Sequence, residues 1–203
     1  MTQTSSSKRQ TCRCCGYPGR QCVCDLVPET HGSLTVWILQ DKKEAKHAKN
    51  TARLFVLGYR QTKIIDMADE HQWHTFLQSV TPVNTILLYP DDNAQPLELV
   101  SQQSRSTIEN VVLLDGTWPK AKKMMLTFNE LLTFPRVLFS SPPKSGYVIR
   151  KSPSDTALST FEAASYALGI LDREFDAPVM KAFFDTAVAR QWAQQPKAHK
   201  HIS

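Results

Sequence analysis

The sequence predicts an α/β protein with a mostly parallel sheet, preceded by a small metal-binding module. Three observations favour this architecture. Short runs rich in Val, Ile and Leu alternate with longer amphipathic stretches, all five cysteines lie between Cys12 and Cys24, and the pattern changes near residue 30. Strands that alternate with helices are typical of parallel sheets. We therefore expect a metal-binding module over residues 8–30 and an α/β domain over residues 31–203.

The apolar pattern predicts the individual elements. Runs that are short and apolar throughout indicate strands buried on both faces, and they lie at 34–39, 85–89, 111–114 and 136–139. The amphipathic stretches predict helices at about 43–57, 69–79, 118–131, 156–172 and 177–194.

Composition narrows the class of protein. The chain has 203 residues, 41% hydrophobic and 21% charged, which is typical of a globular protein and not of a disordered one. No apolar run approaches the roughly 18 residues of a membrane span, so we expect a cytoplasmic protein without membrane contact, and no protein partner is evident. The net charge of +5 favours an anionic partner such as nucleic acid.

The cysteines predict a zinc site. Cys12 and Cys15 form a C-x-x-C pair, and Cys22 and Cys24 form a C-x-C pair seven residues later. Four thiolates at this spacing can close around one zinc ion in a structural site, with Cys14 as a bystander. Ordinary reduced cysteines and an iron–sulfur cluster are the alternatives.

A basic stripe is predicted on the helix that follows Gln40. Lys42, Lys46, Lys49 and Arg53 are separated by four, three and four residues, which places them on one helix face. Such a stripe matches a phosphate backbone. A solvated helix face without a ligand is the alternative.

The segment after residue 114 has the pattern of a strand-to-helix turn at the carboxyl edge of a sheet, where ligands of open α/β sheets bind. Gly116 allows backbone to approach a ligand, and Thr117 can cap the following helix. Asp115 and Trp118 are not needed for a turn, so they are candidates for chemistry. Trp118 could stack on a base or adenine, or could simply be core.

A second candidate segment opens the helix predicted at 156–172. Ser159 and Thr160 offer hydroxyls and backbone N–H groups that could receive a carboxylate. The alternative is an ordinary helix start with Glu162 in its first turn.

Several of these strings resemble the DTW-domain family of transfer-RNA uridine aminocarboxypropyltransferases. Leu114 to Trp118 is similar to the D-x-T-W signature. The cysteine array, the string from Asn50 to Leu54, Tyr147-x-x-Arg150-Lys151 and the string from Leu158 to Ala163 are similar to family segments in the expected order. The resemblance implies a SPOUT-like fold whose carboxyl-terminal part is knotted. It also implies transfer of the 3-amino-3-carboxypropyl group of S-adenosylmethionine to N3 of a uridine in tRNA.

The resemblance and the patterns together give candidate residues for each role. The catalytic candidates are Asp115, Thr117 and Trp118, with Asp115 either a general base or an anchor for the cofactor's amino group. The cofactor-binding candidates are Leu114, Gly116, Arg150, Ser159, Thr160 and Glu162. The RNA-binding candidates are Lys42, Lys46, Lys49, Asn50, Arg53 and Lys151, and the zinc ligands are Cys12, Cys15, Cys22 and Cys24. A SPOUT-like RNA methyltransferase and a non-catalytic zinc-containing RNA-binding protein are the alternative functions.

Overall fold

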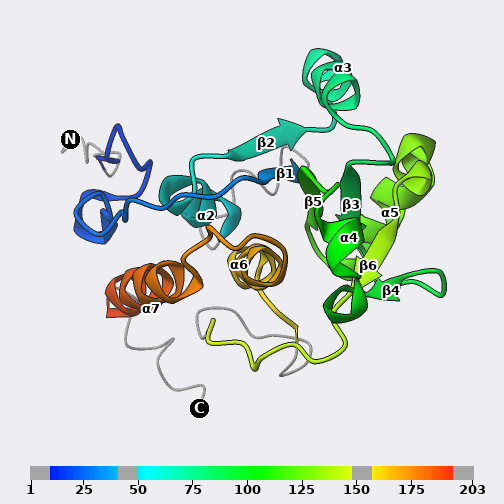
Figure 1. Ribbon diagram of the computed structural model, residues 1–203. Coiled ribbons are helices and arrows are strands. Elements are labelled where there is room, and N and C mark those ends of the chain that lie inside the picture. The colour runs from blue at the N-terminus through cyan, green and yellow to red at the C-terminus, as the bar shows by residue number, and fades with distance from the viewer. Residues whose placement is uncertain (1–9, 41–49, 148–156, 194–203) are drawn as a thin grey trace, which may run out of the picture.

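The computed structural model describes residues 10–40, 50–147 and 157–193. Its centre is a six-stranded sheet in the order β2-β1-β5-β3-β6-β4 (Figure 1). Every strand pair is parallel, which confirms the predicted α/β class with a parallel sheet. The strands are β1 (Thr35–Gln40), β2 (Thr62–Asp66), β3 (Thr85–Leu88), β4 (Gln95–Pro96), β5 (Asn110–Asp115) and β6 (Arg136–Leu138).

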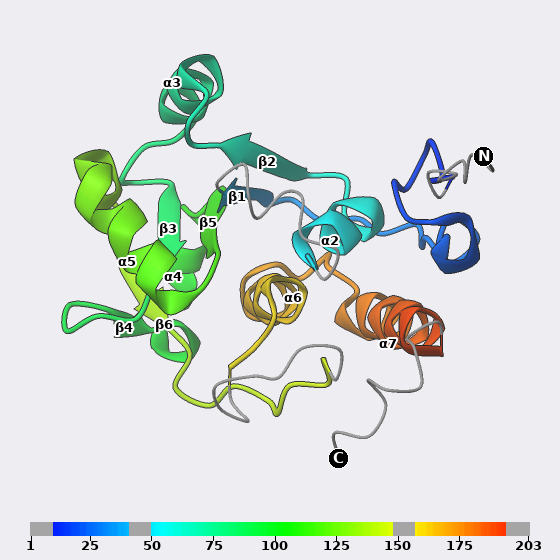
Figure 2. The same cartoon turned by 180° about the vertical axis from the view of Figure 1, so that it is seen from behind.

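Helices cover both faces of the sheet. Figures 1 and 2 show α2, α6 and α7 on one side and α3 and α5 on the other. The α-helices are α2 (Ala52–Gly58), α3 (Glu70–Ser79), α4 (Gln102–Arg105), α5 (Trp118–Thr127), α6 (Thr160–Leu171) and α7 (Ala177–Ala193). Short 3-10 turns are η1 (Gly19–Gln21), η2 (Leu97–Leu99) and η3 (Asn129–Thr133).

The central strands are apolar throughout because both of their faces are buried. Alternate residues of β1 belong to two separate cores: Val36 and Ile38 pack with α2, α6 and α7, whereas Trp37 and Leu39 pack with α3 and α5. Side chains of a strand alternate between faces, so a strand between two helical layers needs apolar residues at every position. The predicted strand at 34–39 is explained in this way.

The helix predicted over 43–57 is corrected by the structure. Helix α2 begins only at Ala52, and Asn50 and Thr51 precede it as non-helical residues. The side-chain oxygen of Asn50 accepts a hydrogen bond from the backbone N–H of Arg53, as a helix-capping residue does. The helix that carries Arg53 therefore does not extend back through residue 50. Residues 41–49 lie outside the described parts of the chain.

Strand β2 was not predicted, because its sequence is not apolar throughout. It lies at the edge of the sheet, and Lys63 and Ile64 on it are exposed. The helix predicted at 118–131 ends at Thr127 and gives way to η3, and the helix predicted at 156–172 begins at Thr160. The helices at 69–79 and 177–194 agree with α3 and α7 within one residue over the described part of the chain.

The amino-terminal segment packs closely on α7 and α2. Cys15, Tyr17 and Val23 are buried in the same apolar core as α7. Arg190 on α7 forms an ion pair with Asp25 and also donates to the backbone oxygen of Cys22. The division of the chain at residue 30 stays a prediction, because these contacts join the segment to the rest of the molecule.

Two further expectations concern membrane spans and the knot. Among the described helices, none is long and apolar enough to cross a membrane. The knot of the carboxyl-terminal part stays a prediction, and residues 148–156, which lie between β6 and α6, are outside the described part.

Candidate active site and metal centre

The strand register gathers polar side chains at the carboxyl edge of the sheet. Gln40, the last residue of β1, is paired with Asp115 on β5 and with Asp66 on β2. Gln40 and Asp115 are both buried, at 3% and 7% exposure. The edge therefore holds a carboxylate shielded from solvent, at the place where ligands of parallel sheets bind.

Among the described residues, three side chains donate hydrogen bonds to the Asp115 carboxylate. The amides of Gln40 and Asn50 donate to Oδ2 over 3.1 and 2.8 Å. The hydroxyl of Thr160 donates to Oδ1 over 2.5 Å. These donors come from the end of β1, the segment before α2 and the first turn of α6. Both carboxylate oxygens are thus held by uncharged donors, which stabilise negative charge.

The start of α2 is tied directly to the start of α6. The backbone N–H of Phe161 donates to the hydroxyl oxygen of Thr51 over 3.3 Å. Phe161 also packs edge-on against Phe55 with ring centroids 5.3 Å apart. These contacts fix the relative positions of Asn50 and Thr160 around Asp115.

The predicted cofactor residues Ser159 and Glu162 form a capping box at the start of α6. The Glu162 carboxylate accepts from the backbone N–H of Ser159, and it also accepts from the hydroxyl of Ser145 and the N–H of Gly146. These contacts are those of an ordinary helix start with Glu162 in the first turn, the alternative given above. Glu162 fastens the loop after β6 to α6 and so supports Thr160, which contacts Asp115.

The turn after β5 has the predicted shape with one difference. Thr117 is the amino-terminal cap residue of α5, but its side chain makes no capping hydrogen bond. A Cβ atom on Gly116 would approach Cβ of Lys120 to 3.2 Å, so glycine suits the close start of α5. Trp118 is 56% exposed, which rules out the core alternative for its indole and leaves it accessible at the start of α5.

The predicted RNA contacts divide into two groups. Lys42, Lys46, Lys49 and Lys151, together with the cofactor candidate Arg150, lie outside the described residues. Asn50 is buried against Asp115. The guanidinium of Arg53 donates to the backbone oxygen of Gly16 and lies 5.5 Å from the ring centroid of Tyr17. Among the described residues of this group, the structure brings Asn50 into the site and places Arg53 against the cysteine-bearing segment.

Four cysteines converge as the sequence predicts. The ligand atoms of Cys12, Cys15, Cys22 and Cys24 all lie within 4.8 Å of one another. The Sγ atoms of Cys12 and Cys24 are 3.6 Å apart, and those of Cys15 and Cys22 are 3.7 Å apart. A tetrahedron with Zn–S bonds of about 2.3 Å has sulfurs about 3.8 Å apart, so the donor set fits zinc. Cys14 is exposed and is not part of this cluster.

The electrostatics of this cluster also suit a cation. Backbone N–H groups of Cys15 and Cys14 lower the pKa of Cys12 to about 6. The thiols around Cys24 raise the pKa of Cys24, and Cys22 has the largest effect. Four thiolates this close repel one another, so they cannot all ionise without a positive charge between them. A divalent metal ion supplies that charge.

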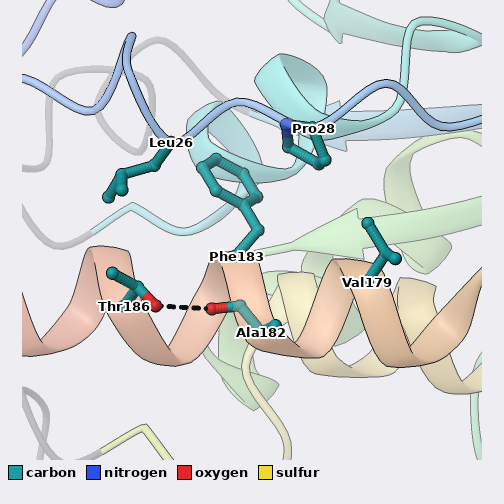
Figure 3. Close-up of a pocket in the computed structure, with 6 residues that line it drawn as sticks. All are labelled: Leu26, Pro28, Val179, Ala182, Phe183 and Thr186. Carbon is teal, nitrogen blue, oxygen red and sulfur yellow. Dashed lines mark hydrogen bonds between the residues drawn. The ribbon is translucent and has the colours of Figure 1, made fainter.

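A pocket of about 290 Å³ lies elsewhere, between the amino-terminal segment and α7 (Figure 3). Phe183 points from α7 toward the segment that carries Leu26 and Pro28. Val179, Ala182 and Thr186 complete the lining. None of the predicted site residues that the structure describes lines this pocket.

Gln40 and Thr51 are parts of the site that the sequence patterns did not reveal as functional. Gln40 ends the apolar run of β1, and a polar residue at the last position of a buried strand was the available signal. Thr51 lies within the string from Asn50 to Leu54, which the family resemblance included without giving Thr51 a role.

The geometry defines a parallel α/β protein with a buried carboxylate at the carboxyl edge of its sheet and a cluster of four cysteines that could hold a metal ion. A model of the family described as the DTW domain matches residues 9–192. The chain therefore belongs to the DTW domain family.

Curated relatives extend this result. The chain is 31% identical to tRNA-uridine aminocarboxypropyltransferase 2 of Drosophila melanogaster over 82% of its own length and 68% of that protein. It is 30% identical to the proteins of the same name from Macaca fascicularis and Mus musculus. Each alignment covers 83% of this chain, which spans 58% of the length of those two relatives.

A solved structure also matches part of the fold. It is that of the SAM-dependent rRNA:acp-transferase Tsr3 from Vulcanisaeta distributa, with a TM-score of 0.43 and 20% sequence identity. The match covers 80% of this chain and 74% of the other.

Proposed function

We propose that this protein transfers the 3-amino-3-carboxypropyl group of S-adenosylmethionine to N3 of a uridine in tRNA. The observation that carries the proposal is the Asp115 carboxylate, buried at the carboxyl edge and held by Gln40, Asn50 and Thr160. The names of the relatives, all tRNA-uridine aminocarboxypropyltransferases, support the same reaction. A protein that only bound RNA would have no need for a carboxylate organised in this way.

The residues at this edge fit the donor molecule. When bound, S-adenosylmethionine supplies an electrophilic carbon at the γ position of its methionine part, and methylthioadenosine is left after transfer. Its amino group is a cation, and a buried carboxylate is the natural partner of a cation. Leu114 and Gly116 flank that carboxylate, and Arg150 and the start of α6 with Ser159, Thr160 and Glu162 complete the proposed binding region.

The contacts of Asp115 favour the anchor role over the role of general base. Both of its oxygens already accept hydrogen bonds, and donors to a carboxylate favour its ionised form. A carboxylate stabilised in this way is a poor acceptor for the uridine imide proton but a good partner for an ammonium group. We propose that Asp115 holds the amino group and orients the γ-carbon toward N3, so that the N3–C bond forms as the C–S bond breaks and the N3 proton is released to solvent.

The surface beside Asp115 suits RNA. Trp118 is exposed at the start of α5, and Lys122 and Lys123 on the same helix are exposed. Helix α5 contains no acidic residue. An aromatic ring can stack on an unpaired base, and lysines can neutralise phosphates. We propose that Thr117 and Trp118 border the uridine and that the α5 lysines, with Lys42, Lys46, Lys49, Arg53 and Lys151, contact the tRNA.

The metal centre and the architecture complete the proposal. A zinc ion held by Cys12, Cys15, Cys22 and Cys24 would staple residues 8–30 as a module beside the α/β domain of residues 31–203. A SPOUT-like threading of the carboxyl-terminal part of the chain belongs to the same proposal. A cytoplasmic location belongs to the same proposal, because reduced thiolates are required for the zinc site.

One experiment tests the function. Purified protein is incubated with total tRNA and S-adenosylmethionine, and the nucleosides are analysed by mass. A uridine heavier by an aminocarboxypropyl group, together with methylthioadenosine, is expected. A methylated nucleoside would instead identify an RNA methyltransferase, and tRNA binding without any modified nucleoside would identify a non-catalytic binding protein.

The Asp115→Asn variant makes this test specific to the site. Loss of the charge should lower the single-turnover rate by about 10²- to 10⁴-fold. Weakened binding of S-adenosylmethionine with intact tRNA binding would support the anchor role. A wild-type rate in this variant would mean that Asp115 only shapes the turn.

A further inference from the structure

We infer that Asn50 is a positioning residue for Asp115, and that it acts through the carboxylate and not by touching RNA. This inference rests on the proposed function, because it gives Asn50 a part in the same transfer reaction. It replaces the role as an RNA contact that the sequence suggests for Asn50.

The chemistry of the two partners determines how the Asn50 amide is oriented. Its oxygen accepts from the backbone N–H of Arg53 over 3.2 Å, and its nitrogen donates to Asp115 Oδ2 over 2.8 Å. A backbone N–H can only donate, and a carboxylate can only accept, so a flipped amide would lose both hydrogen bonds. The Asn50 amide is therefore fixed at both ends.

The position of Asn50 is in turn held by neighbouring residues. The guanidinium of Arg53 contacts Gly16 and Tyr17 in the cysteine-bearing segment, and Thr51 accepts from the first turn of α6. Asn50 is only 9% exposed. A buried side chain held in this way is suited to orient a carboxylate and has little surface to offer an RNA strand.

Charged side chains on α2 and α6, which flank Asp115, contact neighbouring loops. Arg53 is placed on Gly16, and Glu162 is placed on Ser145 and Gly146. Lys120 approaches Gly116 from α5. Among the described residues, amide and hydroxyl groups donate to Asp115, and Asn50 contributes the 2.8 Å hydrogen bond to Oδ2.

The Asn50→Asp variant tests the inference. It keeps the oxygen that caps α2 but replaces the amide donor with a second carboxylate oxygen beside Asp115. Two adjacent carboxylates share a proton, and one pKa of the pair is raised. The protonated pair can restore a donor, so we expect the ratio of variant to wild-type kcat to be highest at low pH and to fall as pH rises. Near pH 7 the loss should be about 10- to 100-fold.

Asn84→Asp is the matched control. Asn84 donates to the Glu109 carboxylate over the same 2.8 Å, and its oxygen also accepts from a backbone N–H, that of Thr81. Asn84 lies just before β3, at the amino ends of the parallel strands, whereas Asp115 lies at their carboxyl ends. This variant should leave kcat and its pH profile unchanged. Asn50→Ser, which keeps a capping oxygen on a shorter side chain, is the second variant if Asn50→Asp does not fold.

The readouts separate the possible outcomes. A fall in kcat with KM for tRNA and its salt dependence unchanged supports the inference. A raised KM for tRNA with unchanged kcat would identify Asn50 as an RNA contact, and wild-type kinetics in both Asn50 variants would also overturn the inference. A wild-type protein that transfers nothing would reject the proposed function itself, and the catalytic role of Asn50 with it.

Discussion

The hydroxyl of Thr160 lies 2.5 Å from Oδ1 of Asp115, although the two residues are 45 positions apart in the chain. Thr160 is the first residue of α6, and Asp115 is the last residue of β5. One polar group at the start of α6, the Thr160 hydroxyl, therefore binds a side chain of the sheet and is not free to bind a ligand. This contact leads to the first prediction.

Thr160→Val should slow the transfer reaction. The variant removes the hydroxyl donor while keeping the branched shape, and a hydrogen bond to a charged group contributes about 1.5 to 3 kcal/mol. We expect a loss in kcat on the order of 10-fold or more, and Thr160→Ser should restore most of the rate. Thr186→Val on α7, where the hydroxyl bonds only to its own helix, is the control. An unchanged kcat in Thr160→Val would show that this donor is dispensable.

Cys22→Ser should abolish zinc binding and weaken the fold around the amino-terminal segment. Elemental analysis of wild-type protein should give about one zinc per chain, and the variant should retain little. Structural zinc contributes on the order of 10 kcal/mol in small isolated modules, but here Cys15 and Val23 are also buried in the main core. We therefore expect a smaller fall in the free energy of unfolding, measured by denaturant titration.

Cys14→Ser is the control for that experiment, because Cys14 is exposed and is not part of the four-thiol cluster. It should keep both the metal and the stability of the wild type. Metal-free wild-type protein with full activity would refute the zinc site.

Replacing Lys122 with alanine should weaken tRNA binding in a salt-dependent way. Each lysine that neutralises a phosphate contributes about 0.7 to 0.9 to the slope of log affinity against log salt. Lys122→Ala should reduce the slope by that amount, and a second change at Lys123 should reduce it further. Lys181→Ala, an exposed lysine on α7 paired with Asp185, should have no effect. An unaltered slope in the double variant would assign this face of α5 to solvent.

Glu98→Gln should destabilise the protein at neutral pH but not in acid. Although partial burial acts in the opposite direction, N–H groups of Ser140 and Ser141 lower the pKa of Glu98 from 4.5 to about 2. A carboxyl whose pKa is lowered by folding stabilises the native state above its unfolded pKa, and the contribution disappears as pH falls through the folded pKa. The difference in free energy of unfolding between wild type and variant should therefore shrink from about pH 5 to about pH 2.

Glu130→Gln provides the comparison, since Glu130 is an exposed glutamate on η3. Its stability should follow that of the wild type at each pH. A Glu98 variant with a constant deficit across the whole range would mean that lost packing, and not lost charge, explains the effect.

The sequence alone determined the features that depend on local pattern. Apolar runs identified the central strands because residues on both faces of those strands are buried. The spacing of Cys12, Cys15, Cys22 and Cys24 identified the four-cysteine cluster because short turns bring near neighbours together. The turn around Asp115 was recognisable for the same reason. Local pattern failed at β2, where an edge strand alternates less regularly, and at residues 50 and 51, where a helix was expected.

Only the tertiary structure decided which side chains surround Asp115. Gln40 reaches it because β1 lies beside β5, and Asn50 and Thr160 reach it from positions 65 and 45 residues away. Hydrogen bonds act over about 3 Å and depend on direction, whereas hydrophobic patterning specifies only which face of an element is buried. The order of strands in the sheet and the return of α6 to its edge therefore turned separate polar residues into one site.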